Sequence, residues 1–111
     1  MPESTNRGAL TEAVYYILLS VFNPLHGYGI MQLVSELSNN RLSLGPGTLY
    51  GAINTLLKKE WIELVDTANN VRKKEYIITD LGKEIIKQEI TRLKELIGNG
   101  TKISGGDKND L

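Results

Sequence analysis

One alternating stretch interrupts a chain whose other patterns are all helical. Residues 61–65 (Trp-Ile-Glu-Leu-Val) alternate between apolar and polar, and residues 74–78 (Lys-Glu-Tyr-Ile-Ile) are rich in β-forming side chains. Asn69-Asn70 lies between these segments, and asparagine tolerates left-handed turns. The pattern predicts a single β-hairpin. Because an isolated two-stranded hairpin is only marginally stable in water, it must pack against the helices around it.

Three helical segments precede the hairpin. The first begins at Thr11, a good N-cap, and ends near Phe22, before an Asn-Pro pair that stops a helix. The second spans about residues 28–37, where apolar side chains recur at i, i+3, i+4 and i+7. The third begins at Pro46, a favoured first-turn residue, and reaches about Lys59.

A fourth helix follows the hairpin. Thr79 is a good N-cap for this helix, and Gly98 is a favoured residue just past a helix end. Residues 98–111 contain four glycines and only one internal aliphatic residue, which predicts a disordered tail. Residues 1–8 are polar, and we expect a flexible N-terminus there. The folded part is then about residues 9–97, a size at which a lone core is marginal.

Two of these helices carry more apolar surface than one small core needs. The first helix is apolar on both sides, with Tyr15, Tyr16 and Leu19 on its second face. On the last helix, apolar side chains step by four, three and four residues, which is coiled-coil spacing. Beside that seam, Leu81 and Ile85 are expected to hold the helix to its own domain. We therefore expect a homodimer whose interface consists of Tyr15, Tyr16, Leu19, Ile86, Ile90, Leu93 and Ile97.

The order helix, helix, helix, β-hairpin, helix is the plan of a winged helix-turn-helix. The predicted fold class is mainly α (α+β), with a two-stranded β-wing and a C-terminal dimerisation helix. Residues 9–78 would form the DNA-binding domain and residues 79–97 the dimerisation helix. In this fold the third helix enters the major groove of DNA, and the second helix and a short turn precede it.

Local charge agrees with this plan, although total charge does not demand it. The chain has 13 basic and 13 acidic side chains and no net charge. Arg72, Lys73 and Lys74 follow one another where the hairpin loop meets its second strand, and such a cluster suits DNA phosphates. Lys58 and Lys59 add two positive charges at the end of the third helix. A merely solvated turn is the alternative interpretation of the cluster.

Four motifs stand out over about residues 9–97, and they are Leu10-Thr-Glu-Ala-Val-Tyr-Tyr-Ile-Leu, His26-Gly-Tyr-Gly-Ile30, Leu44-Gly-Pro-Gly-Thr-Leu-Tyr50 and Arg72-Lys-Lys-Glu-Tyr-Ile-Ile-Thr-Asp-Leu-Gly82. In type and in order, these motifs resemble those of the PadR family of bacterial transcriptional regulators. The resemblance implies a winged-helix dimer, joined through the C-terminal helix and the first helix, that usually acts as a repressor. With one C-terminal helix, the chain is similar to the short subfamily.

The resemblance also implies which residues contact DNA. In the family these come from the third helix and the wing. Asn54 can make a bidentate pair with adenine, and Thr48 can bond a phosphate near the helix N-terminus. Tyr50 either places its hydroxyl on the DNA backbone or packs against the second helix. By position, the DNA-binding role falls on Pro46, Thr48, Tyr50, Asn54, Lys58, Arg72, Lys73 and Lys74.

Several classes of function are excluded or disfavoured. The chain has no cysteine and a single histidine, His26, so disulfides, cysteine-ligated zinc and thiol catalysis are ruled out. It has no phosphate-binding P-loop and no nucleophile elbow. We expect no enzyme, no metal and no cofactor. The longest apolar run, Ala13 to Leu19, is far shorter than the ~20 residues of a membrane span, and with no secretory signal we expect a cytoplasmic protein without membrane association.

Three functions remain open at this point. The principal prediction is a homodimeric regulator, a repressor, that binds double-stranded DNA at a pseudo-palindromic operator. The first alternative is a winged-helix module whose third helix meets a protein, which a neutral net charge mildly favours. The second is a regulator that senses a small-molecule effector at the dimer interface. Some short PadR members bind flat drugs there through a Trp on the last helix, but residues 79–97 contain no aromatic side chain.

Overall fold

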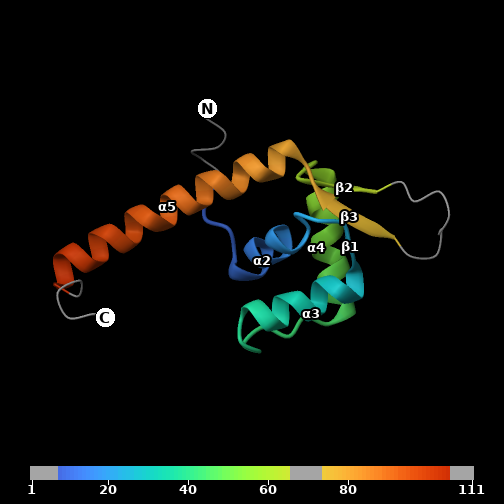
Figure 1. Cartoon of the computed structure of the whole chain (residues 1–111), viewed down its shortest axis with the longest axis horizontal. Coiled ribbons are helices and arrows are strands. Elements are labelled where there is room, and N and C mark those ends of the chain that lie inside the picture. Colours follow the sequence, from blue (N-terminus) through green and yellow to red (C-terminus); the bar gives the residue numbers. More distant parts are fainter. Residues whose placement is uncertain (1–7, 66–73, 106–111) are drawn as a thin grey trace.

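The helices and strands follow the predicted order, with one addition. The computed structural model describes residues 8–65 and 74–105. Its elements are α2 (Glu12–Ser20), β1 (Leu25–His26), α3 (Gly27–Leu37), α4 (Pro46–Lys58), β2 (Ile62–Leu64), β3 (Glu75–Ile78) and α5 (Asp80–Ser104). Figure 1 shows α2, α3, α4 and the small sheet gathered at one end of the molecule, with α5 leaving them as a long arm. The arrangement confirms the predicted winged helix-turn-helix fold.

The sheet contains one strand more than predicted. β3 lies in the middle and pairs antiparallel with both β1 and β2. Leu25 is opposite Tyr76 and His26 is opposite Glu75, so the predicted two-stranded wing is part of a three-stranded sheet. A two-residue strand is too short to produce an alternating pattern, which is why the sequence did not reveal β1. The extra pairing anchors a hairpin that would be marginal alone.

Both predicted threonine caps form. The Thr11 hydroxyl accepts a hydrogen bond from the Val14 N–H at 3.1 Å, and the Thr79 hydroxyl accepts one from the Gly82 N–H at 3.0 Å. The Thr79 hydroxyl also donates to the Glu60 carbonyl at 2.7 Å, which joins the start of α5 to the end of α4. Gly82 is required there because a Cβ at this position would lie 2.2 Å from the Trp61 carbonyl oxygen.

One hydrophobic core joins the four helices of the described residues to the sheet. Each buried aliphatic side chain contributes about 1.5–3 kcal/mol relative to full exposure, so this cluster is the main source of stability. The buried apolar residues are Ile17, Leu18, Val21, Ile30, Val34, Leu49, Ile53, Leu56, Trp61, Ile62, Tyr76, Ile78, Ile85 and Ile86.

A buried carboxylate ties the N-terminal segment to α5. Glu89 is buried on α5, and its Oε2 accepts the Leu10 N–H at 3.3 Å. Its Oε1 accepts from the Arg92 Nε at 3.1 Å. Hydrogen bonding to Glu89 raises the pKa of Arg92 above its ordinary value. The charge that α5 buries is therefore compensated within the chain, and the segment leading into α2 is fixed against α5.

The last helix is longer than predicted. The expected end at Gly98 was wrong, since α5 continues to Ser104 and ends at Gly105, which adopts a left-handed conformation (φ 73°). Residues 98–104, assigned to a disordered tail, are therefore helical. A glycine inside a helix costs about 1 kcal/mol relative to alanine, which an established helix tolerates. The Thr101 hydroxyl donates to the Ile97 carbonyl at 3.0 Å within this stretch. Residues 1–7 and 106–111, the rest of the predicted flexible ends, lie outside the described residues.

Only the first ten residues of α5 belong to the core. Its buried residues are Gly82, Ile85, Ile86 and Glu89, and beyond them the helix extends away from the sheet (Figure 1). The longest dimension of the molecule is 55 Å. Within residues 8–65 and 74–105, none of the helices combines the length and the apolar character that crossing a bilayer demands.

Candidate nucleic-acid interface

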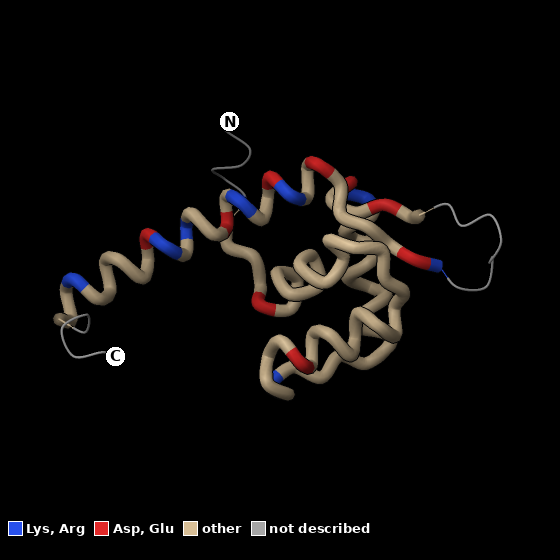
Figure 2. Tube along the Cα trace, in the orientation of Figure 1, with Lys and Arg blue, Asp and Glu red and all other residues tan. Residues whose placement is uncertain are grey.

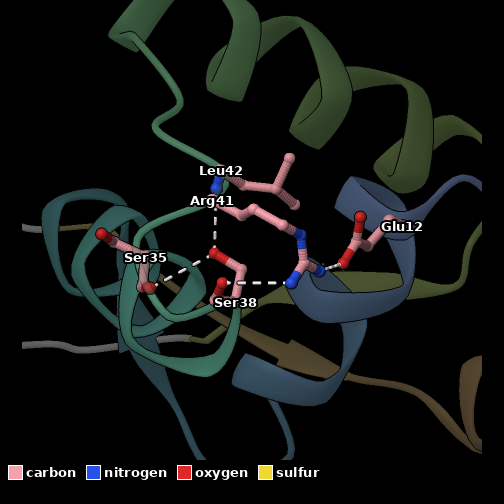
Figure 3. A network of polar contacts seen from close by, with 5 residues as sticks. All are labelled: Glu12, Ser35, Ser38, Arg41 and Leu42. Carbon is pink, nitrogen blue, oxygen red and sulfur yellow. Dashed lines mark hydrogen bonds and ion pairs between the residues drawn. The ribbon is translucent and has the colours of Figure 1, made fainter.

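The turn between α3 and α4 is held by a network of polar contacts (Figure 3). The Ser38 hydroxyl is its centre: it donates to the Ser35 carbonyl at 3.2 Å and accepts the Leu42 N–H at 2.9 Å. The Arg41 guanidinium donates to the Ser38 carbonyl at 3.3 Å and forms an ion pair with Glu12 on α2. The turn is thereby bonded to both helices that precede α4.

Two consecutive asparagines reverse the chain in this turn. Asn39 and Asn40 have φ values of 55° and 65°, a left-handed conformation that asparagine tolerates better than most residues. The Asn40 side chain is fixed because its Oδ1 accepts the Ser35 hydroxyl at 2.8 Å. These contacts set the angle between α3 and α4, and with it the direction in which α4 presents its outer face.

The outer face of α4 is exposed and unusually bare. Its inner face buries Leu49, Ile53 and Leu56. Gly47 and Gly51 lie on the outer face, where a Cβ would meet nothing within 4 Å. The protein's own packing therefore does not require glycine at either position, and Gly51 costs helix stability. A surface kept free of side chains in this way leaves room for a partner to approach the helix backbone closely.

The predicted contacts on α4 border these glycines. Asn54 follows Gly51 by three residues and Lys58 follows it by seven, so both lie on the same stripe of the helix. Thr48 lies beside that stripe, in the first turn. The sequence prediction is thus spatially coherent, and the residues that it placed on α4 are exposed, namely Pro46, Thr48, Tyr50, Asn54 and Lys58.

The N-terminus of α4 suits an anion. Its N-cap is Gly45, which offers no side chain to the first-turn N–H groups, and the first turn has no acidic residue. N–H groups at a helix start lack intrahelical acceptors and carry the positive end of the helix dipole. In Figure 2 the whole of α4 is free of acidic positions. A phosphate placed at this end would find donors and no repulsion.

Tyr50 packs against its own chain. A Cβ on Gly27 would lie 2.0 Å from the Tyr50 hydroxyl oxygen, so the ring occupies the space above the start of α3. Burial, and secondarily the nearby Tyr50, raises the pKa of Tyr76 on β3. These contacts match the packing alternative for Tyr50, although 42% of the residue stays exposed.

The sequence predicts two clusters of basic side chains, one at the end of α4 and one before β3, and the structure describes only the first of them in full. Lys74 is exposed just before β3, whereas Arg72 and Lys73 lie outside the described residues. At the end of α4, Lys58 is exposed, but the Lys59 ammonium lies 5.1 Å from the centre of the Trp61 ring. Lys59 is thus engaged in a cation–π contact within the chain.

The residues expected at a dimer interface divide into two groups. Ile86 is 4% exposed and belongs to the chain's own core, and Tyr15, Tyr16 and Leu19 are partly buried against that core. Ile90 and Ile97 are exposed on the arm, and Leu93 between them is half-buried. The sequence analysis missed two further exposed apolar residues on α5, Leu96 and Ile103. Ile103 was missed because the helix was ended at Gly98.

Leu81 does not have its expected role. It was expected to hold α5 to the domain together with Ile85, and only Ile85 does so. Leu81 is 48% exposed because it lies in the first turn of α5, where the helix has just left the sheet. No group of three or more histidine, aspartate or glutamate side chains that could hold a metal occurs in the part of the chain that the structure describes.

Comparison with known proteins gives this surface a context. Residues 16–88 match the model of the family described as "Transcriptional regulator PadR-like family". The chain is 35% identical over 97 residues to a protein of Lysinibacillus sphaericus designated protein X, covering 82% of this chain and 86% of that protein. It is 33% identical over 75 residues to a 37.1 kDa protein of transposon TN4556 from Streptomyces fradiae; the match covers 68% of this chain and 21% of that longer relative.

The fold has solved counterparts as well. A PadR-like transcription factor from Bacteroides fragilis superposes with a TM-score of 0.63 at 25% identity, over 82% of this chain and 87% of that one. The family match includes α3, the turn, α4 and the sheet, which are the elements that build the exposed face described above. The chain belongs to the PadR-like family of transcriptional regulators.

Proposed function

We propose that this protein is a sequence-specific, double-stranded-DNA-binding repressor that acts as a homodimer. The observation that carries the proposal is the bare outer face of α4, with Gly47 and Gly51 in open space beside an uncapped helix N-terminus. The major groove admits an α-helix, and a helix with short side chains reaches the base edges most closely. A protein partner would more often be met by several large apolar side chains, whereas Tyr50 is the single large apolar side chain exposed on α4.

Different residues on α4 would contact the bases and the phosphates of the DNA. Asn54, which is exposed on this face, would pair with an adenine edge, a contact worth about 1–3 kcal/mol of base discrimination. The first-turn N–H groups and Thr48 would hold one phosphate, and Lys58 a second at the other end of the helix. The cluster Arg72 to Lys74 would grip phosphates beside the groove. Tyr50 would support this surface from behind by its packing over Gly27.

The dimer would form through the arm. Ile90, Leu93 and Ile97 lie on one line of α5 beyond the point where the helix leaves its own core. Exposed apolar residues in a row on a helix indicate a partner helix. A two-fold dimer would present two copies of α4 to half-sites about 34 Å apart, or a multiple of that distance, on a pseudo-palindromic operator.

The test separates binding from folding by using Gly51→Leu. Leucine at this open helical position improves helix propensity by about 1 kcal/mol, so thermal stability should be kept or raised. The same side chain would hold α4 away from the base edges, and we expect affinity for a labelled duplex from the region upstream of the protein's own gene to fall at least about 100-fold. Fluorescence anisotropy measures this loss.

A matched control exists on the same chain. Gly98 is also a mid-helix glycine with open space around it, and it lies off the line of Ile90, Leu93 and Ile97. Gly98→Leu should gain the same helix propensity and leave DNA affinity unchanged. If Gly51→Leu binds the duplex as tightly as the wild type, α4 does not enter the groove and the proposal fails.

A small-molecule effector is a second proposal, with one observation in its favour. An open cavity of about 310 Å³ lies between the N-terminal segment and α4, lined by Leu10, Val14, Ala52, Leu56 and Trp61 among others. A ligand there would touch α4 directly and could shift its presentation only by binding one arrangement better. The fluorescence of Trp61, the single tryptophan, reports occupancy in a titration with planar apolar compounds.

A further inference from the structure

A second surface lies beyond everything assigned to DNA or to the dimer. It is an open groove of about 520 Å³ between the end of α4, the strand β2 and the first turn of α5. Two large apolar side chains lie in it exposed, Leu64 (49%) and Leu81 (48%), beside the partly buried Leu57. None of the predicted DNA-binding or dimer residues lines this groove, which we call the β2 groove.

The β2 groove contains a free sheet edge. β2 is one of the two edge strands of the sheet, because among the described strands only β3 pairs with it. The Thr79 N–H bonds the Trp61 carbonyl and the Val65 N–H bonds the Glu75 carbonyl, so the backbone groups of alternate residues 61, 63 and 65 face β3. The N–H and C=O groups of Ile62 and Leu64 therefore point away from β3. Ile62 is covered by the chain's own side chains, so the backbone groups of Leu64 are the ones open to a partner along this edge.

The rim of the β2 groove is acidic. Glu60, Glu63 and Asp80 line it, and none of them forms an ion pair with any residue in 8–65 or 74–105. Figure 2 shows acidic positions near β2 and the first turns of α5, with basic positions between them. The residues that line the groove itself include these three acidic side chains and no basic one, which is a local excess of negative charge around apolar side chains.

We propose that the β2 groove binds an extended, lysine- or arginine-bearing segment of a partner protein as an added strand. The outward N–H and C=O groups of Leu64 would supply main-chain hydrogen bonds, which is the usual basis of strand addition. Leu57, Leu64 and Leu81 would receive its apolar side chains. The three carboxylates would attract its basic ones, and charge complementarity selects this occupant over DNA, which the rim repels.

The experiment uses the full-length protein and a defined probe. The probe is a fluorescein-labelled peptide of about seven residues in which Lys and Val alternate, a typical strand length. We expect saturable binding by anisotropy that weakens with salt. Amide hydrogen exchange measured by NMR shows where on the protein the peptide binds. At a peptide concentration about ten times its Kd, exchange at Leu64 should slow about tenfold, while Glu63, already bonded to β3, changes little.

Reversing the charge on the rim of the β2 groove tests whether peptide binding depends on its acidic residues. In a Glu60→Lys/Glu63→Lys variant, affinity for the lysine peptide should fall at least about fivefold, and a peptide with Glu in place of Lys should bind better than it does to the wild type. A Glu84→Lys/Glu95→Lys variant carries the same charge change on exposed positions of α5 outside the groove and should bind like the wild type. Operator affinity, followed separately, should not weaken in either variant.

Three results would overturn the proposal. The first is no saturable binding of the lysine peptide. The second is equal binding of the lysine and glutamate peptides to the wild type. The third is concentration-dependent protection of Leu64 in the protein alone, which would make a second copy of the chain the occupant. Because operator binding is measured in the same variants, failure here is distinguishable from failure of the DNA proposal.

Discussion

The two longest helices expose opposite kinds of surface. The outer face of α4 exposes glycines and short polar side chains, whereas the distal part of α5 exposes isoleucines and leucines. Both faces lie in open space, so neither is explained by the packing of its own chain. Under the proposed function, the difference corresponds to two kinds of partner. The polar major groove admits a helix with short, hydrogen-bonding side chains, and a second protein helix needs apolar side chains to bury.

A substitution in the exposed apolar surface of α5 should have the largest effect on assembly and operator affinity. Ile97 is 65% exposed on the arm, and Ile97→Glu places a charge in the middle of the expected helix pair. We expect a monomer by sedimentation equilibrium and a loss of operator affinity of about 100-fold or more, because two linked half-site contacts become one. Thr91→Glu, on another side of the same helix, should stay dimeric; a dimeric Ile97→Glu protein would place the interface elsewhere.

The salt dependence of operator binding tests the polar surface, which is the expected DNA interface. Replacing Arg72, Lys73 and Lys74 by Ala should lower operator affinity and reduce the salt slope of binding by up to about three per subunit, roughly one for each lost phosphate contact. Dimerisation through α5 should hardly respond to the same salt range, because apolar burial does not release counterions. An unchanged salt slope in the triple variant would remove the wing from the DNA interface.

A smaller effect is expected where α4 meets α3. Gly27→Ala introduces a methyl group into the space of the Tyr50 hydroxyl, which must move. Overpacking of this kind costs about 1–3 kcal/mol, measured by chemical denaturation. Tyr50→Phe in the same background should recover part of that loss. Full stability in Gly27→Ala alone would show that Tyr50 is free to leave, and would favour its other predicted role on the DNA backbone.

The smallest effect is expected at the turn. Arg41→Ala removes an ion pair with Glu12 whose side chains are both substantially exposed, so the cost in stability is about 0.2–1 kcal/mol. Operator affinity should fall by a few-fold at most, since Ser38 still holds the turn. Glu12→Gln should give a similar or smaller loss. A collapse of DNA binding in Arg41→Ala without a loss of stability would instead indicate a direct phosphate contact.

Local signals in the sequence predicted most of the fold. Thr11 and Thr79 cap their helices as expected, and Pro46 begins α4. What the sequence could not reveal depends on contacts distant along the chain. β1 exists because Leu25 and His26 meet β3, and no pattern of two residues carries that information. The glycines at 98 and 100 resemble a helix end, yet the left-handed cap forms later, at Gly105.

For the candidate sites as well, local features were predictable from the sequence, and contacts between distant residues were not. The composition of the α4 face was visible in the sequence, since Gly51, Asn54 and Lys58 recur on one side of a helix. Their neighbours were not visible. Lys59 looked equivalent to Lys58, but only the tertiary structure brings its ammonium over Trp61. Leu81 looked like a core residue, and only the course of α5 leaves it in the β2 groove.

The open glycines of α4 have a consequence for how such a protein can diversify. Side chains can be introduced at positions 47 and 51 without a clash inside the fold, and at mid-helix position 51 most replacements raise helix propensity. Under the proposed function, new DNA preferences can therefore arise there without a compensating change in the core. Selection for a different operator and selection for a stable protein act on separate residues, and descendants of this chain can change one property while they keep the other.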